Sequence, residues 1–449
     1  MSERKLIVIG GDAAGMTAAS KIRREQPERE IIVFERGHYT SYAACGIPYY
    51  IAGHVESEED LIARKPEVFR EKQNIDLRTR HEVIEIDAGN KQVKVKDIEK
   101  DEVYTETWDD LLIATGASAI KPDLPGIDAK GVFALSSLQS GIDVFNFLKK
   151  NSPKKAVIVG GGYIGIEMAE ALLDRDMKVT LIDMAPQVMT TMDMDMAELI
   201  LEFMKKEGIK VFPEEKLSRF ENYADGGIKS VITDKKSHHA DLVILGMGVK
   251  PNSELAAEAG IKLGAGNSIC VKKDLTTSVP HIWAAGDCAE SYHLLKKQQV
   301  FVPLGTVANK HGLVAGINIS GGKAEFPGVL GTAITKFREL EISRTGLSEK
   351  ETKELGLDYK SNTIEATTLS SYFPGTGKIT VKLIAEKETG RILGGQIVGF
   401  NGAAKRIDTI ASAITGNMTA QQLVDMDLSY APPFSPVWDP VQIAARTLL

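Results

Sequence analysis

The sequence has few cysteines, no long hydrophobic run and no excess of basic residues. Its three cysteines, Cys45, Cys270 and Cys288, lie far apart and form no CxxC pair, which argues against a disulfide framework and a cysteine-based zinc site. The adjacent histidines His238 and His239 lie in a polar stretch and are expected to form a solvated turn. No apolar run approaches the ~18–20 residues of a membrane helix. We therefore expect a cytoplasmic protein without a metal or a membrane partner.

The charge and length narrow the class of protein further. The formal net charge is −7, which argues against a general nucleic-acid-binding protein. With 43% hydrophobic and 26% charged residues, the composition is ordinary for a globular protein. At ~150 residues per domain, the 449-residue chain suggests roughly three domains.

The first 35 residues alternate strand, glycine-rich turn, helix and strand. The β-branched run Lys5–Ile9 leads into Gly10–Gly15, helix formers follow, and a strand at Ile31–Phe34 ends at Glu35. Glycines permit the tight turn and close packing of helix on strand, and a helix N-terminus directs free N–H groups at a pyrophosphate. An acid at the end of the second strand can accept from a ribose diol. This segment predicts a dinucleotide site.

One residue of this turn departs from the GxGxxG pattern. Asp12 stands where the pattern has its second glycine. A carboxylate beside a phosphate is unfavourable unless its side chain points away. We expect this departure to weaken only that one contact.

A second segment repeats the arrangement with all three glycines. A strand at Lys155–Val159 precedes the turn, and the next strand at Val179–Ile182 ends at Asp183. The glycines of the pattern are Gly160, Gly162 and Gly165. Two such segments predict two bound dinucleotides; the alternative is a doubly wound fold whose glycine-rich turns bind none.

Three further apolar strands end in glycine. They are Leu111–Thr115 before Gly116, Leu242–Leu245 before the sequence GMGVKPN, and Ile282–Ala285 before Gly286-Asp287. Ligands of open α/β sheets bind at the carboxyl ends of such strands. Each of these turns is equally explained as a simple strand end.

The pattern changes after about residue 326. Ile379–Ile384 and Ile392–Val398 read as an antiparallel hairpin, Ala403–Thr415 has helical spacing of apolar residues, and Thr419–Gln422 is a capping box. An aromatic and proline-rich segment follows at Tyr430–Pro436. We expect an α+β domain here, and the last segment is either a surface loop or an insertion into a partner.

Taken in order, these motifs resemble the flavoprotein pyridine nucleotide-disulfide oxidoreductases over essentially the whole chain. The resemblance implies an α/β fold with two Rossmann-like, three-layer dinucleotide-binding domains and a C-terminal α+β dimerisation domain in a homodimer. It places the first part of the FAD domain at residues 1–112, the NAD(P)H domain at 113–245, the second part of the FAD domain at 246–325 and the interface domain at 326–449.

The same resemblance implies the cofactors FAD and NADH, or possibly NADPH, and the residues that bind them. For FAD these are Gly10, Ala13, Ala14, Gly15, Glu35, Arg36, Tyr42, Val83, Thr115, Gly116, Asp287, Leu304 and Gly305. For NAD(P)H they are Gly160, Gly162, Tyr163, Ile164, Gly165, Glu167, Asp183 and Gly248. Asp287 would hold the flavin ribityl chain, and Tyr163 would act as a gate.

The branch of the family is indicated by the sequence around Cys45. Most relatives carry a CxxxxC redox pair, whereas the stretch from Ser41 to Pro48 reads SYAACGIP with a single cysteine. It is similar to the SFxxCGxP signature of the single-cysteine branch, which contains coenzyme A (CoA) disulfide reductases, CoA-dependent sulfur and persulfide reductases, and NADH oxidases and peroxidases. A following helix N-terminus and an oxidised flavin would both stabilise a thiolate at Cys45. A buried structural cysteine is the alternative.

Ala13 separates the members of that branch. The oxidases and peroxidases carry a histidine at the matching position, and Ala13 offers no acid–base group. This favours a mixed disulfide at Cys45 over a sulfenic acid, and so favours a CoA-disulfide or persulfide reductase. An NADH oxidase or peroxidase is the alternative, and a non-catalytic or electron-transfer flavoprotein a more distant one.

The resemblance also implies a CoA site and residues supplied by a second subunit. Lys21, Arg24, Ser41 and Lys72 match positions that contact CoA in the relatives; a solvated basic face explains the cations equally well. Tyr372 and Tyr430 match tyrosines that reach the active site from the partner chain. CoA is expected as a substrate or as a tightly bound ligand.

Overall fold

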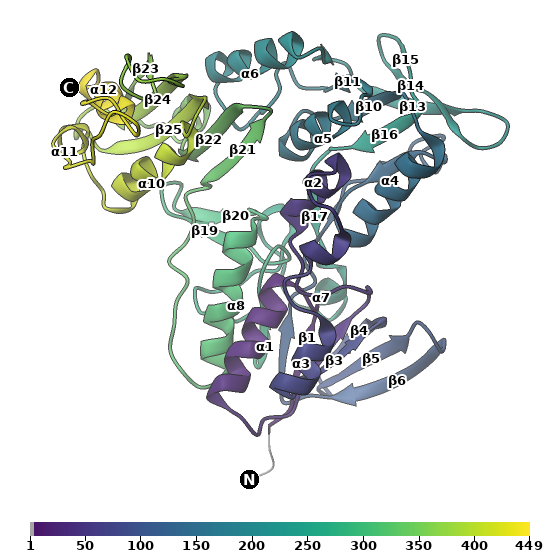
Figure 1. Ribbon diagram of the computed structural model, residues 1–449. Coiled ribbons are helices and arrows are strands. Elements are labelled where there is room, and N and C mark those ends of the chain that lie inside the picture. The colour runs from purple at the N-terminus through teal and green to yellow at the C-terminus, as the bar shows by residue number, and fades with distance from the viewer. Residues whose placement is uncertain (1–3) are drawn as a thin grey trace. The chain divides into compact units, whose positions relative to one another are not determined.

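The computed structural model describes residues 4–449 and separates into two compact units (Figure 1). Unit 1 contains the chain up to Ile120, Leu135–Lys150 and Val249–Val329. Unit 2 contains Lys121–Ala134, Asn151–Gly248 and Leu330–Leu449. Each unit is therefore built from segments that are distant in the sequence. The domain boundaries given above, which follow function rather than contacts, stay a prediction.

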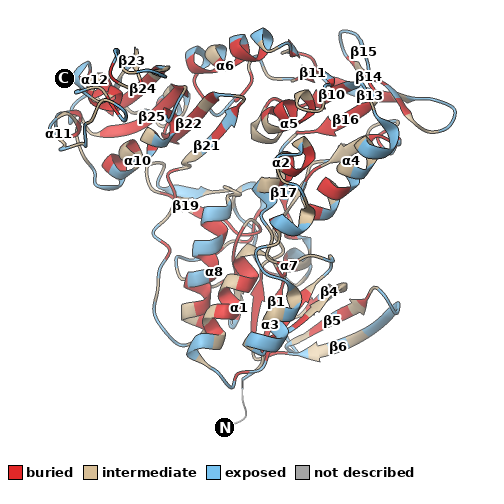
Figure 2. Cartoon of the chain, viewed as in Figure 1, coloured by how far each residue is buried: buried red, intermediate tan, exposed pale blue. Residues whose placement is uncertain are grey.

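A five-stranded parallel sheet forms the centre of unit 1. Its strand order is β18 (Ile282–Ala284), β7 (Asp110–Ile113), β1 (Leu6–Ile9), β2 (Ile31–Glu35) and β3 (Asp76–Thr79). Every residue of β1 is buried, as its uninterrupted apolar sequence predicts for a strand covered on both faces (Figure 2). The predicted strand, turn, helix and strand at the start of the chain are confirmed.

Helix α1 (Ala13–Glu25) follows β1 and packs along α8 (Gly305–Ile319). The two helices approach closely at Gly312, where a Cβ atom would lie 2.4 Å from the carbonyl oxygen of Ala14. Further helices of unit 1 are η1 (Ala44–Gly46), α2 (Ile47–Ala52), η2 (Glu58–Leu61), α3 (Pro66–Gln73), most of α4 (Leu138–Asn151), α7 (Glu254–Glu258) and η3 (Ala265–Asn267). Further strands are β4 (His81–Asp87), β5 (Gln92–Asp97), β6 (Glu102–Thr107), β8 (Ala117–Ala119), β17 (Val249–Pro251), β19 (Ser291–His293) and β20 (Gln298–Val300).

Unit 2 repeats the sheet of unit 1. Its parallel strands are ordered β12 (Lys210–Phe212), β11 (Lys178–Ile182), β10 (Lys155–Val159), β16 (Leu242–Leu245) and β9 (Val132–Ala134). Helix α5 (Tyr163–Leu173) follows β10 as α1 follows β1, and α6 (Met194–Lys206) follows β11. The second predicted strand, turn, helix and strand are thus confirmed as well.

The prediction of a solvated turn at the two adjacent histidines is wrong. His238 lies in β15 (Ser237–His239), the last strand of an antiparallel sheet with β13 (Leu217–Asn222) and β14 (Ile228–Thr233). Its side chain is buried, and its Nε2 lies 2.8 Å from a carboxylate oxygen of the equally buried Glu215. Alternate residues of a strand face opposite sides, so one histidine is buried although the sequence around it is polar.

The last 120 residues of unit 2 form an antiparallel sheet with helices. The strand order is β21 (Ala333–Phe337), β22 (Leu340–Gly346), β25 (Ile392–Gly399), β24 (Lys378–Glu386) and β23 (Tyr359–Thr367). The helices are α9 (Glu349–Glu354), η4 (Ala404–Arg406), α10 (Ile407–Thr415), α11 (Ala420–Val424) and α12 (Pro440–Arg446). The predicted hairpin is β24–β25, and the capping box of Thr419 and Gln422 opens α11.

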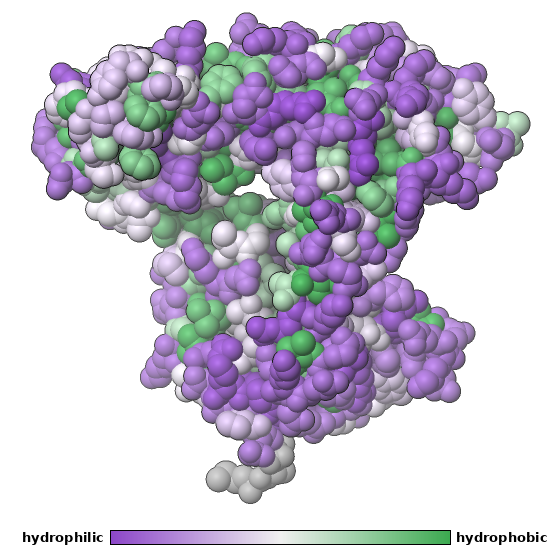
Figure 3. All heavy atoms as spheres, in the orientation of Figure 1, coloured by the Kyte–Doolittle hydropathy of each residue, from purple (hydrophilic) through white to green (hydrophobic). Residues whose placement is uncertain are grey.

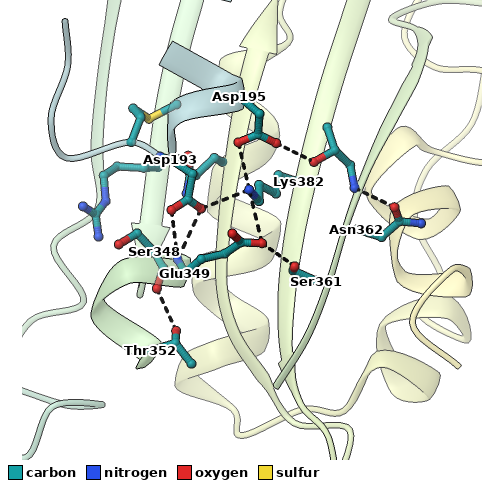
Figure 4. A network of polar contacts seen from close by, with 12 residues as sticks. Asp193, Asp195, Ser348, Glu349, Thr352, Ser361, Asn362 and Lys382 are labelled. Atoms are coloured by element: carbon teal, nitrogen blue, oxygen red, sulfur yellow. Dashed lines mark hydrogen bonds and ion pairs between the residues drawn. The ribbon is translucent and has the colours of Figure 1, made fainter. Parts of the chain in front are cut away.

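A buried lysine links this sheet to α6 within unit 2. Lys382 on β24 has 6% of its side chain exposed, and its ammonium lies 2.8 Å from Asp195, 3.4 Å from Asp193 and 3.4 Å from Glu349 (Figure 4). Gln396 of β25 donates to Asp193 at 2.6 Å. Three carboxylates therefore surround one cation, at the wall of a cavity of about 710 Å³.

No helix among residues 4–449 is long and apolar enough to cross a membrane. Hydrophilic residues cover most of the visible face, and hydrophobic residues form scattered patches on it (Figure 3).

Candidate active site

The first glycine-rich turn has a geometry that only glycine permits. Gly10 has a φ of +110°, and a Cβ atom there would lie 2.1 Å from the carbonyl oxygen of Ala114, the residue after β7. A Cβ at Gly15 would lie 2.0 Å from the carbonyl oxygen of Gly10. These contacts bring the N-terminus of α1 against the strand ends, the position at which a phosphate can meet free N–H groups.

The second turn repeats these contacts. Gly160 has a φ of +106°, and a Cβ at Gly165 would lie 1.9 Å from the Gly160 carbonyl oxygen. A Cβ at Gly162 would meet no atom within 4 Å. The space in front of Gly162 is therefore open to a ligand that approaches the backbone closely.

The acid that ends the second strand holds the turn in both units. Glu35 accepts from the backbone N–H of Gly11 at 2.9 Å and of Gly37 at 2.7 Å. Asp183 accepts from Gly161 at 2.6 Å and from Ala185 at 2.8 Å. A carboxylate has about four lone-pair sites, so each acid keeps acceptor capacity for a ribose while it fixes the turn. Their part in ribose binding stays a prediction.

The residues around Asp287 fit a bound flavin. Gly286, with a φ of +82°, lies close to Ala14, and the Oδ1 atom of the following Asp287 is buried without a hydrogen-bond partner. Burial raises the pKa of Asp287 to about 6. A buried polar atom without a partner calls for a ligand or water, and the hydroxyl groups of a ribityl chain are suitable donors. A Cβ at Gly116 or Gly305 would meet nothing within 4 Å, which leaves room at both loops.

Asn252 fixes the loop after β7, a role that the sequence reasoning missed. Its side chain donates to the carbonyl oxygen of Thr115 at 2.7 Å and accepts from the hydroxyl of Ser118 at 2.7 Å. The Thr115 hydroxyl donates to the Asn252 carbonyl oxygen at 2.6 Å. Pro251-Asn252 is part of a motif in the sequence, but its pairing with a residue 137 positions away depends on the fold.

The other predicted FAD residues lie at several places in unit 1. Ala13 and Ala14 open α1, and Leu304 is the N-cap of α8. Arg36 follows β2 and is exposed, whereas Val83 is buried in β4. Nothing in these positions tests their contact with FAD, and they stay predictions.

Cys45 lies in the short helical turn η1, which leads directly into α2. The cysteine is exposed, so the alternative of a buried structural cysteine does not hold. Cys288, by contrast, is fully buried beside the strand ends. Cys45 is thus accessible to a substrate, three residues after the predicted FAD residue Tyr42.

The predicted CoA residues of unit 1 lie on two adjacent helices and one loop. Lys21 and Arg24 are on α1 and Lys72 is on α3; the Ser20 hydroxyl donates to Gln73 at 2.9 Å and joins these helices. Arg24 and Lys72 are exposed. Lys21 forms an ion pair with Glu25 at 2.6 Å, which leaves it less available to a phosphate. Ser41, in the loop, has a left-handed backbone with a φ of 51°.

In unit 2, one predicted NAD(P)H residue contacts the C-terminal sheet. Glu167 accepts from the Thr335 hydroxyl at 2.8 Å, and burial raises its pKa. Burial also raises the pKa of Tyr163, the first residue of α5. Ile164 follows Tyr163 on that helix, and Gly248 has a φ of +86° in the loop after β16.

Tyr372 and Tyr430 lie on neighbouring segments of unit 2. The Ser370 amide donates to the carbonyl oxygen of Pro432 at 3.3 Å, which joins the two segments. The side chains are exposed, Tyr372 by 74% and Tyr430 by 47%. Both tyrosines are therefore available to another molecule, as residues that serve a partner chain must be.

Two family models match the chain. Residues 4–312 match the pyridine nucleotide-disulphide oxidoreductase model, and residues 332–440 match the dimerisation domain of the same family.

Relatives of known name cover the chain from end to end. A CoA-dependent NAD(P)H sulfur oxidoreductase of Pyrococcus abyssi is 41% identical, over 99% of this chain and 98% of the relative. An NADH oxidase of Methanocaldococcus jannaschii is 37% identical over 99% and 98%. The solved structure of an NAD-dependent persulfide reductase from A. fulgidus superposes with a TM-score of 0.95 at 39% identity, over 99% of this chain and 82% of the other.

Proposed function

This chain belongs to the pyridine nucleotide-disulphide oxidoreductase family, and we propose that it reduces a CoA-linked disulfide, persulfide or polysulfide through the single redox cysteine Cys45. Membership of this family implies FAD and NAD(P)H as cofactors and a dimerisation domain at the C-terminus. The observation that carries the proposal is the exposed Cys45 in a loop beside the first glycine-rich turn. The names of the similar sulfur and persulfide reductases support the substrate class.

Cys45 would act as a nucleophile on sulfur. Its thiolate attacks one sulfur of the substrate's S–S bond, releases one thiolate and forms a mixed disulfide. Two electrons cleave the mixed disulfide and return Cys45 as a thiolate, with release of the second sulfur group. When bound, FAD supplies two-electron transfer between NAD(P)H and this sulfur centre. Tyr430 of a partner chain would donate a hydrogen bond to the leaving sulfur.

The basic residues on α1 and α3 would recognise the CoA part of the substrate. Arg24 and Lys72 are exposed on the two helices that Ser20 and Gln73 join. Guanidinium and ammonium groups bind phosphates through charge-assisted hydrogen bonds. CoA carries its phosphates on the nucleotide end, so the pantetheine thiol end remains free to reach a cysteine.

The alternative function is an NADH oxidase or peroxidase with a sulfenic acid at Cys45. The name of the similar Methanocaldococcus protein favours it. Ala13, at the first residue of α1, speaks against it because alanine cannot transfer a proton to a reduced oxygen species.

One experiment separates these functions. One sample of the purified protein is denatured, and the released flavin and any released thiol are identified by mass. With a second, native sample, NADH oxidation is followed anaerobically with CoA disulfide and aerobically without it. We expect FAD, and CoA thiol formed at two per NADH consumed. Aerobic oxygen consumption at a rate comparable to that of NADH oxidation, with no thiol produced anaerobically, would contradict the proposal.

The residue after β11 predicts a preference for NADH. A carboxylate at Asp183 accepts from a ribose 2′-hydroxyl and repels a 2′-phosphate, and no arginine occurs between Met184 and Val188. We expect a higher kcat/KM with NADH than with NADPH. In Asp183→Ala the ratio of the two values should fall by about tenfold, even if the loss of the bond to Gly161 weakens both. Equal or better kcat/KM with NADPH in the wild-type enzyme would refute the preference.

The proposed homodimer makes a prediction about Tyr430. A Tyr430→Phe enzyme should keep its flavin and its dimer but produce thiol more slowly. If Tyr430 acts across the interface, a heterodimer with Cys45→Ser has one site with both lesions and one with neither. Equal mixing and re-equilibration should then restore up to about a quarter of the wild-type sites. Activity no higher than the mean of the two parents would show that Tyr430 does not act in trans.

A further inference from the structure

The two glycine-rich turns can be compared position by position. In unit 1 the Ser41 amide donates to the carbonyl oxygen of Gly11 at 3.2 Å, and in unit 2 the Met189 amide donates to that of Gly161 at 2.8 Å. Ser41 and Met189 also share a left-handed backbone, with φ values of 51° and 48°. The loop after the second strand therefore returns to the turn in the same way in both units.

The turns differ at the residue that follows Gly11 and Gly161. In unit 2 this residue is Gly162, and in unit 1 it is Asp12. Asp12 is the N-cap of α1, but its side chain makes no capping hydrogen bond. Its Oδ1 instead accepts from the backbone N–H of Tyr42 at 3.1 Å. The Asp12 carboxylate is thus engaged with the loop. A carboxylate directed at a bound phosphate would be unfavourable, so this contact explains how the turn can contain an aspartate.

The loop that Asp12 contacts is the one that carries Cys45. This loop is also held by the end of η2 and the residues that follow it: the Ala43 amide donates to the carbonyl oxygen of Leu61 at 2.8 Å, and the Ala63 amide donates to that of Ser41 at 2.9 Å. The corresponding loop of unit 2 carries no cysteine. The extra contact therefore occurs only in the unit whose loop has a redox residue.

We propose that Asp12 is a positioning residue that fixes the Cys45 loop against the flavin-side turn. The role of Cys45 itself rests on the proposed function, whereas the contact of Asp12 with the loop does not. Because Tyr42 is three residues from Cys45, loss of the Asp12 acceptor frees the segment in which the thiol must meet its substrate. A glycine at this position has no side-chain acceptor and could not hold the loop in this way.

The surroundings of Asp12 make this contact sensitive to pH. Burial, together with the nearby carboxylates of Glu35 and Asp287, raises its pKa to about 7, against the effect of the Tyr42 hydrogen bond. The titratable and charged groups that face Asp12 and Tyr42 are Glu35 on β2, Asp287 after β18, the Tyr42 phenol itself and Arg36. An ionised carboxylate accepts more strongly than a neutral acid, so the loop is held more firmly above pH 7 than below it.

The test measures two local properties of the purified holoprotein: hydrogen exchange at the Tyr42 amide and the rate of Cys45 alkylation by iodoacetamide. Asp12→Ala should speed exchange at Tyr42 about tenfold and change the alkylation rate. Asp12→Asn retains an acceptor oxygen and should restore most of the protection. Thr17→Val, which removes from α1 a hydroxyl bonded to Asn309 of α8, should alter neither property. Between pH 6 and 8, protection corrected for intrinsic exchange should rise in the wild type and stay level in Asp12→Asn.

Each outcome decides the question. Unchanged exchange and alkylation in Asp12→Ala, or the same change in Thr17→Val, would overturn the positioning role. If Asp12→Ala does not fold, Asp12→Asn and Asp12→Ser carry the test, and equal exchange in these two, despite the shorter reach of serine, would overturn it. A wild-type enzyme that produces no thiol while Asp12→Ala still frees the loop would refute the proposed function alone.

Discussion

A Cys45→Ser enzyme is expected to produce thiol from CoA disulfide at least about 10³-fold more slowly than the wild type. The physical reason is that a serine oxygen cannot form a mixed disulfide and is a weak nucleophile at neutral pH. Since Cys45 is exposed in η1, the change from sulfur to oxygen leaves no cavity in the core. The flavin content and thermal stability should therefore match those of the wild type. Thiol release under anaerobic conditions measures the effect directly.

A spectroscopic signature accompanies this loss. A thiolate beside an oxidised flavin gives a long-wavelength absorbance band. It should appear when two electrons per subunit from NADH or dithionite have cleaved a mixed disulfide at Cys45 and left the flavin oxidised, and it should be missing in Cys45→Ser. Cys270→Ser is the matched control, because Cys270 is a partly buried cysteine of the same unit and should keep both the band and the activity within about twofold. An unchanged spectrum in Cys45→Ser would remove the basis for assigning Cys45 as the redox residue.

Local rules explain why so much of the fold could be predicted. The strands β1 and β16 are continuous apolar runs, β10 is apolar after Lys155, and each is followed by glycine. Both glycine-rich turns have backbone angles or contacts that admit no side chain. The predicted strands agree with the observed ones to within a residue or two. The hairpin β24–β25 followed from its turn residues and the helix α11 from its capping box.

Contacts between distant residues explain what could not be predicted. The strands β4–β6 and β13–β15 contain polar residues whose burial depends on partners elsewhere, as His238 and Glu215 illustrate. Asn252 binds a loop 137 residues before it. The sequence predicts only that the Asp12 side chain points away from a phosphate. Its hydrogen bond from the Tyr42 amide depends on a loop 30 residues later.

Removal of the buried ammonium in unit 2 should have the largest effect on stability. Lys382 has 6% of its side chain exposed and lies within 3.4 Å of three carboxylates. In Lys382→Met the methionine side chain takes the place of the apolar lysine stem, but Asp193, with 7% of its side chain exposed, loses its cation. Removing one partner of a buried ion pair costs about 3–5 kcal/mol. We expect a value near the lower end, because Asp193 keeps its bonds from Gln396 and the Glu349 amide.

The measurement is the urea midpoint of unfolding at one protein concentration with saturating FAD. Lys350→Met is the matched control: it makes the same substitution at the wall of the same cavity, at a side chain 81% exposed, and should shift stability by less than about 0.5 kcal/mol. Lys382→Arg, which keeps the charge, should be milder than Lys382→Met. A Lys382→Met midpoint equal to that of Lys350→Met would show that the carboxylates do not depend on this lysine.

The difference in stability between the wild type and Lys382→Met is expected to depend on pH. Burial opposes ionisation of Asp195, but the hydrogen bonds from Lys382 and Thr363 outweigh it and hold the pKa of Asp195 below its usual value. A carboxyl group with a lowered folded pKa contributes stability above its unfolded pKa of ~3.9 and loses it as the pH falls through the folded pKa. Without Lys382 the carboxylates gain less from being ionised, so the wild type and Lys382→Met should differ most near pH 7, and the difference should begin to shrink below about pH 4. A difference that stays constant from pH 7 to pH 3 would mean that Lys382 stabilises unit 2 through packing of its stem and not through its charge.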